Sequence, residues 1–148
     1  MSEIGYKDLK DYRPIHVLTA LLMAEARGEP YDGRVSVAFV VRNRVRDRRW
    51  PNTYAEVITQ PYQFSCLLDR DPNQKVFLDN LLPSKNFNLE SMIYRECLGI
   101  AFLVIGNWRK DITQGANHYH ADWMVPFPKW SDPNKITYSV GGHIFYKL

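Results

Sequence analysis

Residues 14–31, "PIHVLTALLMAEARGEPY", form the most strongly patterned segment of the chain. Pro14 suits the first position of a helix, because its missing N–H would have no partner there in any case. Gly28 and Pro30 are typical of the residues that follow a helix end. The segment therefore predicts a helix that runs from Pro14 to about Arg27.

Glu25 lies on the apolar face of this predicted helix. Positions 18, 21, 22 and 25 share one face by helical spacing, and the first three are leucines. Both desolvation and the negative end of the helix dipole would raise the pKa of a carboxyl group placed there. A raised pKa is what a general acid needs near neutral pH. The alternative is an ordinary, partly exposed glutamate that pairs with Arg27 or a lysine.

Glu29 supplies a second carboxylate, but Gly28 and Pro30 place it in a turn. Glycosidases with two catalytic carboxyl groups hold them at defined separations, about 5–5.5 Å in retaining enzymes and wider in inverting ones. The sequence contains no information on that distance. Glu29 is therefore a candidate site residue, and an equally good candidate for a structural role in which it accepts backbone N–H bonds.

The middle of the chain predicts further helices. Asp32 suits the N-cap of a helix over 33–47, in which valine and alanine recur at helical spacing. We interpret the arginines near its C-terminal end mainly as a solvated face, with polyanion binding as the minority alternative; they are Arg42, Arg44, Arg46, Arg48 and Arg49. The capping-box pattern from Thr53 to Glu56 predicts a short third helix.

The remaining segments complete a mainly helical α+β class. We expect a short helix within 71–83, bounded by prolines, and a long apolar helix over 88–105 that crosses the centre of the domain. Strands are expected near 117–121 and 136–146, the latter with a hairpin turn at 141–142. Residues 1–13 are polar and predict an N-terminal lead-in, so the single catalytic domain would span 14–148.

Bulk composition excludes several classes of protein. The chain has 148 residues, enough for one domain with a core, and its net charge of +3 is too small to imply a nucleic-acid partner. Cys66 and Cys97 predict buried thiols rather than a disulfide. The N-terminus lacks an apolar signal-peptide segment and no run of 18 apolar residues occurs. We therefore expect synthesis in the cytoplasm and no membrane span.

The segment "NHYHAD" at 117–122 contains a possible metal half-site. In a strand, His118, His120 and Asp122 share one face, and a third ligand could come from His16 or His143. No H-E-x-x-H pattern occurs, so we favour histidines that donate hydrogen bonds to a substrate or pack structurally. We expect no cofactor.

Several blocks, in order along the chain, resemble the SleB-type cell wall hydrolases, which include spore-cortex-lytic enzymes and phage lysins. The blocks are "AEARGEPYDGRVSVAFVVRNRV" (24–45), "WPNTYAEVI" (50–58), "QFSC" (63–66), "HYHADWMVP" (118–126) and "GGHIFY" (141–146). The resemblance implies a lysozyme-like, mainly α domain with a small C-terminal β element. It also implies that peptidoglycan glycan strands are the substrate.

The resemblance assigns roles to particular residues. It implies that Glu25 is the catalytic acid of a lytic transglycosylase that cuts between N-acetylmuramic acid and N-acetylglucosamine. We expect the remaining candidate site residues to bind substrate in the cleft wall; they are Glu29, Gln63, Phe64, Ser65, His118, Tyr119 and His120. A phage or prophage endolysin is the expected biological role, with access to the wall through a holin or similar pore.

Three alternatives stay open at this point. A hydrolytic muramidase would need a positioned water and usually a second carboxylate, for which Glu29 is the nearby candidate. A zinc-dependent amidase would use His118 and His120. A non-catalytic wall-binding module would use the aromatic residues alone, which make up 14% of the chain.

Overall fold

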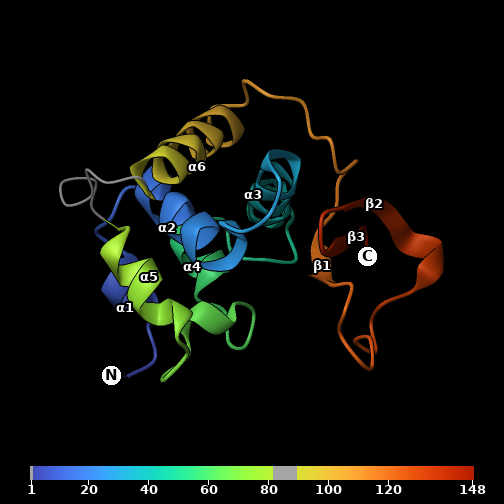
Figure 1. Ribbon diagram of the computed structural model, residues 1–148, viewed down its shortest axis with the longest axis horizontal. Helices are drawn as coiled ribbons and strands as arrows, with labels where there is room; N and C mark the ends of the chain where they lie inside the picture. The colour runs from blue at the N-terminus through green and yellow to red at the C-terminus, as the bar shows by residue number, and fades with distance from the viewer. Residues whose placement is uncertain (1, 82–89) are drawn as a thin grey trace.

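The computed structural model describes residues 2–81 and 90–148 of the chain. Its α-helices and strands follow one another along the chain with all the helices first (Figure 1). The elements are α1 (Tyr6–Leu9), α2 (Pro14–Ala26), α3 (Tyr31–Arg46), α4 (Tyr54–Ile58), α5 (Asn73–Asp79), α6 (Glu90–Ile105), β1 (His118–Ala121), β2 (Ile136–Val140) and β3 (His143–Tyr146). The predicted α+β class, mainly α with a small C-terminal β element, is confirmed.

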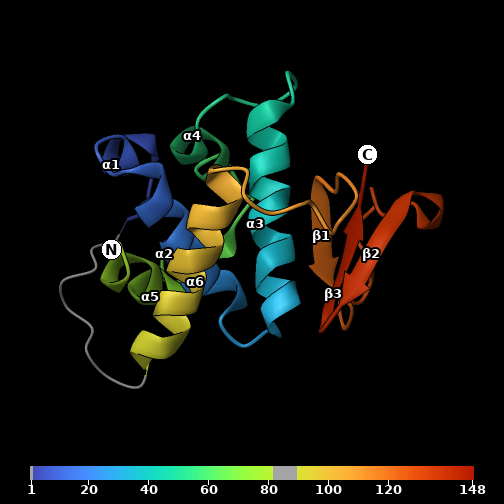
Figure 2. The same cartoon turned by 90° about the horizontal axis from the view of Figure 1, so that it is seen from above.

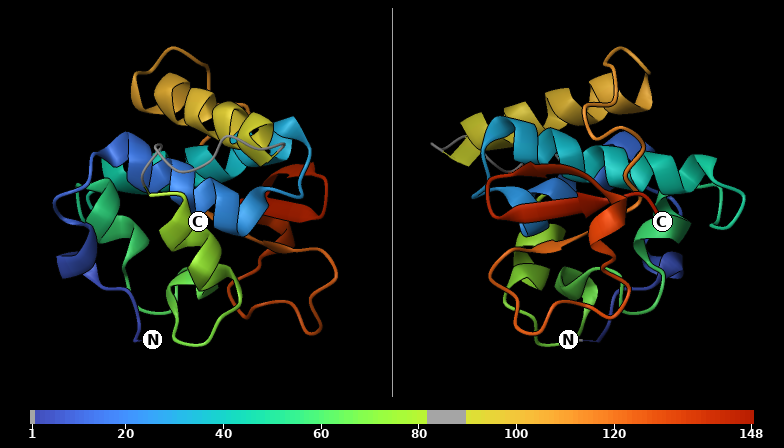
Figure 3. Two further views of the ribbon diagram at one scale, coloured as in Figure 1. Left: turned by 60° about the vertical axis from the view of Figure 1, so that its left-hand side comes forward. Right: turned by 90° about the vertical axis from the view of Figure 1, so that its right-hand side faces the viewer.

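Helix α2 forms the centre of the helical part. Every residue from Val17 to Ala24 is buried, including Thr19, whose hydroxyl donates to the carbonyl of Ile15 at 2.6 Å. Helices α3, α4, α5 and α6 all pack against α2 (Figure 3). The burial of so many apolar side chains is the main source of stability for this layer.

The prediction that the helix of 88–105 crosses the centre is wrong. Helix α6 packs against α2 and α3 on one side only, and on the other side Phe102 is 57% exposed and Met92 is 65% exposed. The buried positions are Tyr94, Cys97, Ile100, Ala101 and Val104, which is one stripe at helical spacing. The sequence of α6 is apolar enough for a core helix, but α2 occupies that place. Residues 88 and 89 of the prediction lie outside the described residues.

Helix α3 lies between the other helices and the sheet (Figure 2). It begins two residues earlier than predicted, with Pro30 at the N-cap, so the prediction of Asp32 as N-cap is wrong. Asp32 lies in the first helical turn, where its carboxylate still faces the positive end of the helix dipole.

The arginines of α3 divide into two groups. Arg46, Arg48 and Arg49 are exposed, as the solvated-face interpretation predicts. Arg42 and Arg44 are buried, so for these two the interpretation is wrong. Their long side chains reach polar partners that come from residues 107–117, far away in the sequence.

The sheet has three antiparallel strands in the order β1-β3-β2. Strands β2 and β3 form the predicted hairpin, whose turn contains Gly141 and Gly142. Gly141 has a φ of +56°, and a β-carbon there would approach the ring of Pro30 to 2.8 Å. Glycine therefore lets this hairpin turn pack closely against the turn that precedes α3.

Two other local predictions, the cap of α4 and the free thiols, are confirmed. The Thr53 hydroxyl accepts a hydrogen bond from the Glu56 N–H at 3.2 Å and caps α4. Both cysteines are buried free thiols. The segment expected to be a polar lead-in instead packs with the rest of the fold: Leu9 of α1 is fully buried, and the Ile4 N–H donates to the Leu67 carbonyl at 2.9 Å. In the part of the chain that the structure describes, no helix is long and apolar enough to cross a membrane.

Candidate active site

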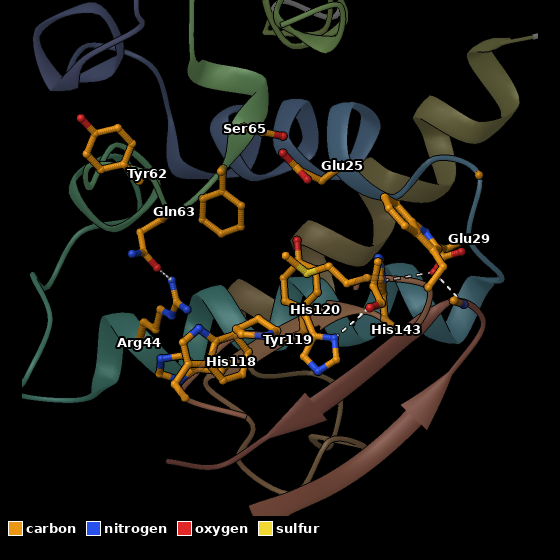
Figure 4. A pocket seen from close by; sticks show the side chains of 18 residues that line it. Glu25, Glu29, Arg44, Tyr62, Gln63, Ser65, His118, Tyr119, His120 and His143 are labelled. Atoms are coloured by element: carbon orange, nitrogen blue, oxygen red, sulfur yellow. Dashed lines mark hydrogen bonds and ion pairs between the residues drawn. The ribbon is translucent and has the colours of Figure 1, made fainter. Parts of the chain in front are cut away.

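A cleft of about 870 Å³ lies between the C-terminal end of α2, the loop before the 3₁₀ turn of Ser65–Leu67, and the sheet (Figure 4). All eight residues that the sequence nominates line this cleft. It also contains residues that were not nominated: Gly28, Arg44, Tyr62, Ala121, Trp123, Met124, Pro128, Trp130, Gly142 and His143. Clefts of several hundred Å³ are the usual size for sites that bind small or oligomeric ligands.

Glu25 is the penultimate residue of α2 and is only partly accessible. Burial raises the pKa of its carboxyl group above the ordinary value, and the nearby Asp71 acts in the same direction. The Cys66 N–H donates to Glu25 Oε1 at 3.2 Å, which opposes the shift without reversing it. This carboxyl group therefore retains its proton to a higher pH than a free glutamic acid.

The alternative in which Glu25 pairs with Arg27 is wrong. Arg27 donates instead to the Met23 carbonyl at 3.0 Å and to Asn73 Oδ1 at 3.1 Å. Among the described residues, no lysine or arginine forms an ion pair with Glu25. Within residues 2–81 and 90–148, the carboxyl group consequently has no cation partner that would hold it in the ionised form.

Glu29 lies in the turn between α2 and α3 and contacts the β2–β3 hairpin. Its Oε1 accepts from the Gly142 N–H at 3.0 Å and lies 3.1 Å from His143 Nδ1. Burial lowers the pKa of His143, while the Glu29 carboxylate acts in the opposite direction. The backbone-binding role expected for Glu29 is present, although the N–H belongs to the hairpin and not to its own turn.

The segment before the 3₁₀ turn forms one wall of the cleft. Phe64 is buried and Ser65 is exposed beside Glu25 (Figure 4). Gln63 Oε1 accepts from Arg44 Nη1 at 2.8 Å. Tyr62 is 86% exposed and has a φ of +60°, which is uncommon for an aromatic residue and often marks a functional position.

His118 is half-buried between two tryptophan rings. Its ring centroid lies 5.9 Å from that of Trp50 and 4.9 Å from that of Trp130. Burial lowers the pKa of His118 to about 4, with Arg44 as the next contribution, so the ring is neutral at pH 7.

The tautomer of His118 follows from its neighbours. Asn117 Oδ1 accepts from the Leu148 N–H at 2.9 Å, and Asn117 Nδ2 donates to the Leu148 carbonyl at 3.0 Å. These two bonds fix the amide orientation. His118 Nδ1, 2.8 Å from the same oxygen, is therefore the donor. Nε2 remains as the nitrogen with a free lone pair.

Both ring nitrogens of His120 are bonded within the protein. Nδ1 lies 2.8 Å from the Ala121 carbonyl and must donate to it, so Nε2 accepts from the Tyr146 hydroxyl at 2.7 Å. The preceding strand residue, Tyr119, stacks on Phe145 with ring centroids 5.5 Å apart. Burial raises the pKa of the Tyr119 hydroxyl well above the ordinary value. His120 and Tyr119 thus form a rigid floor of the cleft.

This arrangement does not suit the zinc alternative. His120 has no nitrogen left for a metal, and His118 uses Nδ1 to bind Asn117. Among the described residues, no group of three histidine, cysteine, aspartate or glutamate side chains could hold a metal ion.

Arg44 reaches the cleft from α3 and is the main residue that sequence reasoning misplaced. Its Nε donates to the Asn117 carbonyl at 2.7 Å, and its guanidinium carbon lies 5.6 Å from the Trp50 ring centre. Burial lowers the pKa of Arg44 to about 10, so it remains charged at neutral pH. Five arginines in eight residues resembled a solvated face, and nothing local distinguished the one that turns inward.

Asp111 anchors the chain segment that leads into β1. Its carboxylate accepts from Asn43 Nδ2 at 2.8 Å, the Thr113 N–H at 2.8 Å and the Gly115 N–H at 2.9 Å. Burial alone would raise the pKa of Asp111, but these hydrogen bonds and that of the Thr113 hydroxyl lower it below the ordinary value. The position of His118 and Tyr119 is thereby fixed relative to α3.

The indications from sequence were weaker for the other residues that line the cleft. Tyr62 and Trp123 fall in aromatic and polar runs that suit a saccharide cleft, and Trp123 is 79% exposed. Trp130 packs against Tyr146 with perpendicular rings, and only the fold brings them together. His143 could be considered a third metal ligand from sequence, whereas here it contacts Glu29.

The fold and site define a class: a lysozyme-like domain with a desolvated carboxyl group of raised pKa at the edge of an aromatic cleft. The chain belongs to the cell wall hydrolase family, which matches residues 28–146. Within this family it is of the SleB type, as two solved structures indicate.

The catalytic domain of the germination-specific lytic transglycosylase SleB from Bacillus anthracis has 27% identity and a TM-score of 0.64 to this chain. The likeness covers 93% of this chain and 98% of that domain. The catalytic domain of the Bacillus cereus SleB protein has 28% identity and a TM-score of 0.65, and the likeness covers 92% of each chain.

Curated relatives match over a shorter segment. The spore cortex-lytic enzyme of Bacillus subtilis is 42% identical over 55 residues, which is 37% of this chain and 18% of that enzyme. The spore cortex-lytic enzyme of Oceanobacillus iheyensis is 38% identical over 65 residues, 41% of this chain and 24% of that enzyme. The matched segments thus span a quarter or less of these enzymes.

Proposed function

We propose that this chain cleaves the glycan strands of peptidoglycan as a lytic transglycosylase, with Glu25 as both general acid and general base. The observation that carries the proposal is the Glu25 carboxyl group, which lines a substrate-sized cleft and whose pKa is raised by burial. The similar SleB domain from Bacillus anthracis is itself described as a lytic transglycosylase.

One carboxyl group suffices for this reaction. Protonated Glu25 gives its proton to the glycosidic oxygen as the bond from that oxygen to the anomeric carbon of N-acetylmuramic acid breaks. The Glu25 carboxylate then takes the proton of the muramic C6 hydroxyl, whose oxygen bonds to the anomeric carbon. A 1,6-anhydro sugar end forms, and Glu25 regains its proton for the next cycle.

The engagement of Glu29 supports the single-carboxyl route. A nucleophile or a base that activates water needs a carboxylate oxygen free to face the sugar. In this chain one of the two oxygens, Glu29 Oε1, already contacts the Gly142 N–H and His143 Nδ1, which ties the carboxylate to the hairpin and leaves Oε2 alone for such a role. Product analysis must therefore distinguish the transglycosylase from the alternative, a hydrolytic muramidase.

Mass spectrometry of digested peptidoglycan tests the proposal. Anhydro-muropeptides from the wild-type protein are the expected product; new reducing ends would instead indicate hydrolysis, and free stem peptides an amidase. Sacculi that bind the protein and release nothing would point to a wall-binding module. A digest without anhydro ends would refute the transglycosylase assignment.

The endolysin role and its holin dependence stay predictions. Expression in a bacterial host with and without a co-expressed pore-forming protein tests them. Lysis only in the presence of the pore is the expected outcome, and lysis or export without the pore would contradict it.

A further inference from the structure

Three arginines of α3 are buried, and within the described part of the chain two of them have a carboxylate partner. Arg34 is 8% exposed and pairs with Glu96, and Arg42 is 9% exposed with Nη2 3.8 Å from Asp111 Oδ2. Arg44 is the most buried of the three, at 5% exposed, yet no carboxylate among the described residues pairs with it.

The neutral partners of Arg44 do not complete its hydrogen bonding. Nε binds the Asn117 carbonyl and Nη1 binds the Gln63 side-chain oxygen. Nη2 has no hydrogen-bond partner among the described residues. It is not fully buried, so a ligand can reach it. Because Arg44 lines the cleft, the small accessible part of its guanidinium is reached from there.

A buried charge without a counterion is costly, and a neutral carbonyl and amide oxygen offset only part of that cost. Guanidinium groups bind carboxylates through charge-assisted hydrogen bonds, which are stronger than neutral ones. Burial lowers the pKa of Arg44 only to about 10, so the guanidinium stays charged at pH 7 and still needs a counterion. The missing partner is therefore an anion that enters with the ligand.

We infer that Arg44 is a specificity-determining residue that binds a carboxylate group of the glycan substrate. This inference rests on the proposed function for the identity of the substrate. Gln63 and Asn117 hold the guanidinium in place, and Trp50 packs against it. Figure 4 shows Arg44 and Gln63 at the end of the cleft opposite Glu29, so the carboxylate would bind away from the Glu29 contact.

Two sources of carboxylate exist in such a substrate. In a peptide-free strand the lactyl group of N-acetylmuramic acid ends in a free carboxylate. In a strand with stem peptides this carboxyl is an amide, and the free carboxylates belong to the peptide. Both offer the same planar anion to Arg44, so the test uses both types of strand.

The test compares wild-type protein on each type of oligosaccharide with its carboxylates free or chemically converted to amides. Affinity is measured by titration calorimetry with Glu25→Gln protein, so that cleavage does not interfere, and kcat and KM are measured with wild type. We expect amidation to weaken binding by about 10- to 100-fold, the range for loss of a hydrogen bond to a charged group. The strand type that shows the effect identifies the carboxylate.

Arg44→Gln and Arg44→Lys provide the matched variants. Arg44→Gln should remove the preference for free carboxylates and mainly raise KM, whereas Arg44→Lys should keep part of it. Equal affinity of Glu25→Gln protein for free and amidated oligosaccharides would overturn the inference. An equal loss by Arg44→Gln on both would also overturn it, since that is the result of a merely structural arginine.

The outcomes separate this inference from the proposed function. If the Glu25→Gln protein distinguishes free from amidated oligosaccharides but wild type cleaves neither, the proposed reaction fails and the carboxylate site stands. If cleavage occurs with no discrimination, the reaction stands and the carboxylate site fails. Absence of binding to every oligosaccharide would overturn the inference.

Discussion

Replacement of Glu25 by glutamine isolates the proton on which the proposed reaction depends. The glutamine side chain has nearly the same shape, and its oxygen can still accept the hydrogen bond that Cys66 N–H gives to Oε1 at 3.2 Å. What it cannot do is donate an acidic proton to the glycosidic oxygen. General acid–base groups contribute about 10²- to 10⁴-fold to rates, so kcat should fall by that factor, equivalent to about 2.7–5.5 kcal/mol in the barrier.

The same substitution should stabilise the folded protein at neutral pH. Burial raises the folded-state pKa of Glu25, so the folded chain holds this proton more tightly than the unfolded chain. In the wild-type protein, the stabilisation that comes from binding this proton is complete below the unfolded-state pKa of about 4.3. It is lost as pH rises through the folded-state pKa. Glu25→Gln protein should therefore unfold at a higher temperature than wild type at pH 7, and the difference should shrink towards pH 4.

Two measurements on the same variant check this reasoning. The rate of anhydro-end formation from sacculi gives the catalytic effect, and thermal unfolding between pH 4 and 8 gives the effect on stability. The exposed Glu3, replaced by glutamine, is the matched control and should change neither. A Glu25→Gln variant with near wild-type activity would refute the catalytic assignment. If the stability difference between Glu25→Gln protein and wild type did not grow in favour of the variant from pH 4 to pH 7, the desolvation argument would be refuted.

Three further predictions concern the cleft walls. Tyr62→Asn keeps a residue that tolerates positive φ but removes the exposed ring, so it should raise KM several-fold with little change in melting temperature. Tyr62→Phe keeps the ring and should behave as wild type. Equal KM values for the two variants would contradict a stacking role. Glu29→Gln removes the charge that raises the pKa of His143, so NMR titration should show a lower His143 pKa, and an unchanged value would refute the contact. Tyr146→Phe leaves His120 Nε2 without its donor and should cost about 1–3 kcal/mol of unfolding free energy, measured by denaturant titration; no loss would contradict the bond.

Local patterns predicted the elements well because the physics that places them is local. Pro14 and the Thr53–Glu56 capping box fix helix starts within one turn of chain, and the glycine pair at 141–142 fixes a hairpin. The order of helices around the core, in contrast, is not determined by local sequence patterns. Both α2 and α6 are apolar enough to be central, and only their tertiary contacts decide that α2 is.

The candidate site was predictable to the extent that a motif carried it. Glu25 could be nominated because an apolar stripe and a family resemblance agree on it. Arg44 could not, since its burial depends on Asn117 and Gln63, which lie 73 and 19 residues away. A sequence pattern records that α3 is basic at its end, but it contains nothing about which guanidinium meets a carbonyl across the fold.

The Glu29 and Arg44 contacts, at opposite ends of the cleft, have a mechanical consequence. Glu29 joins the end of α2 to the hairpin, and Arg44 joins α3 to both Gln63 and Asn117. These polar bonds connect the cleft walls at the rim, in addition to the apolar contacts by which Phe145 of β3 joins the helical core. The width of the opening is thus an adjustable dimension of this domain, one that substitutions at two positions could alter while the helical core keeps its packing.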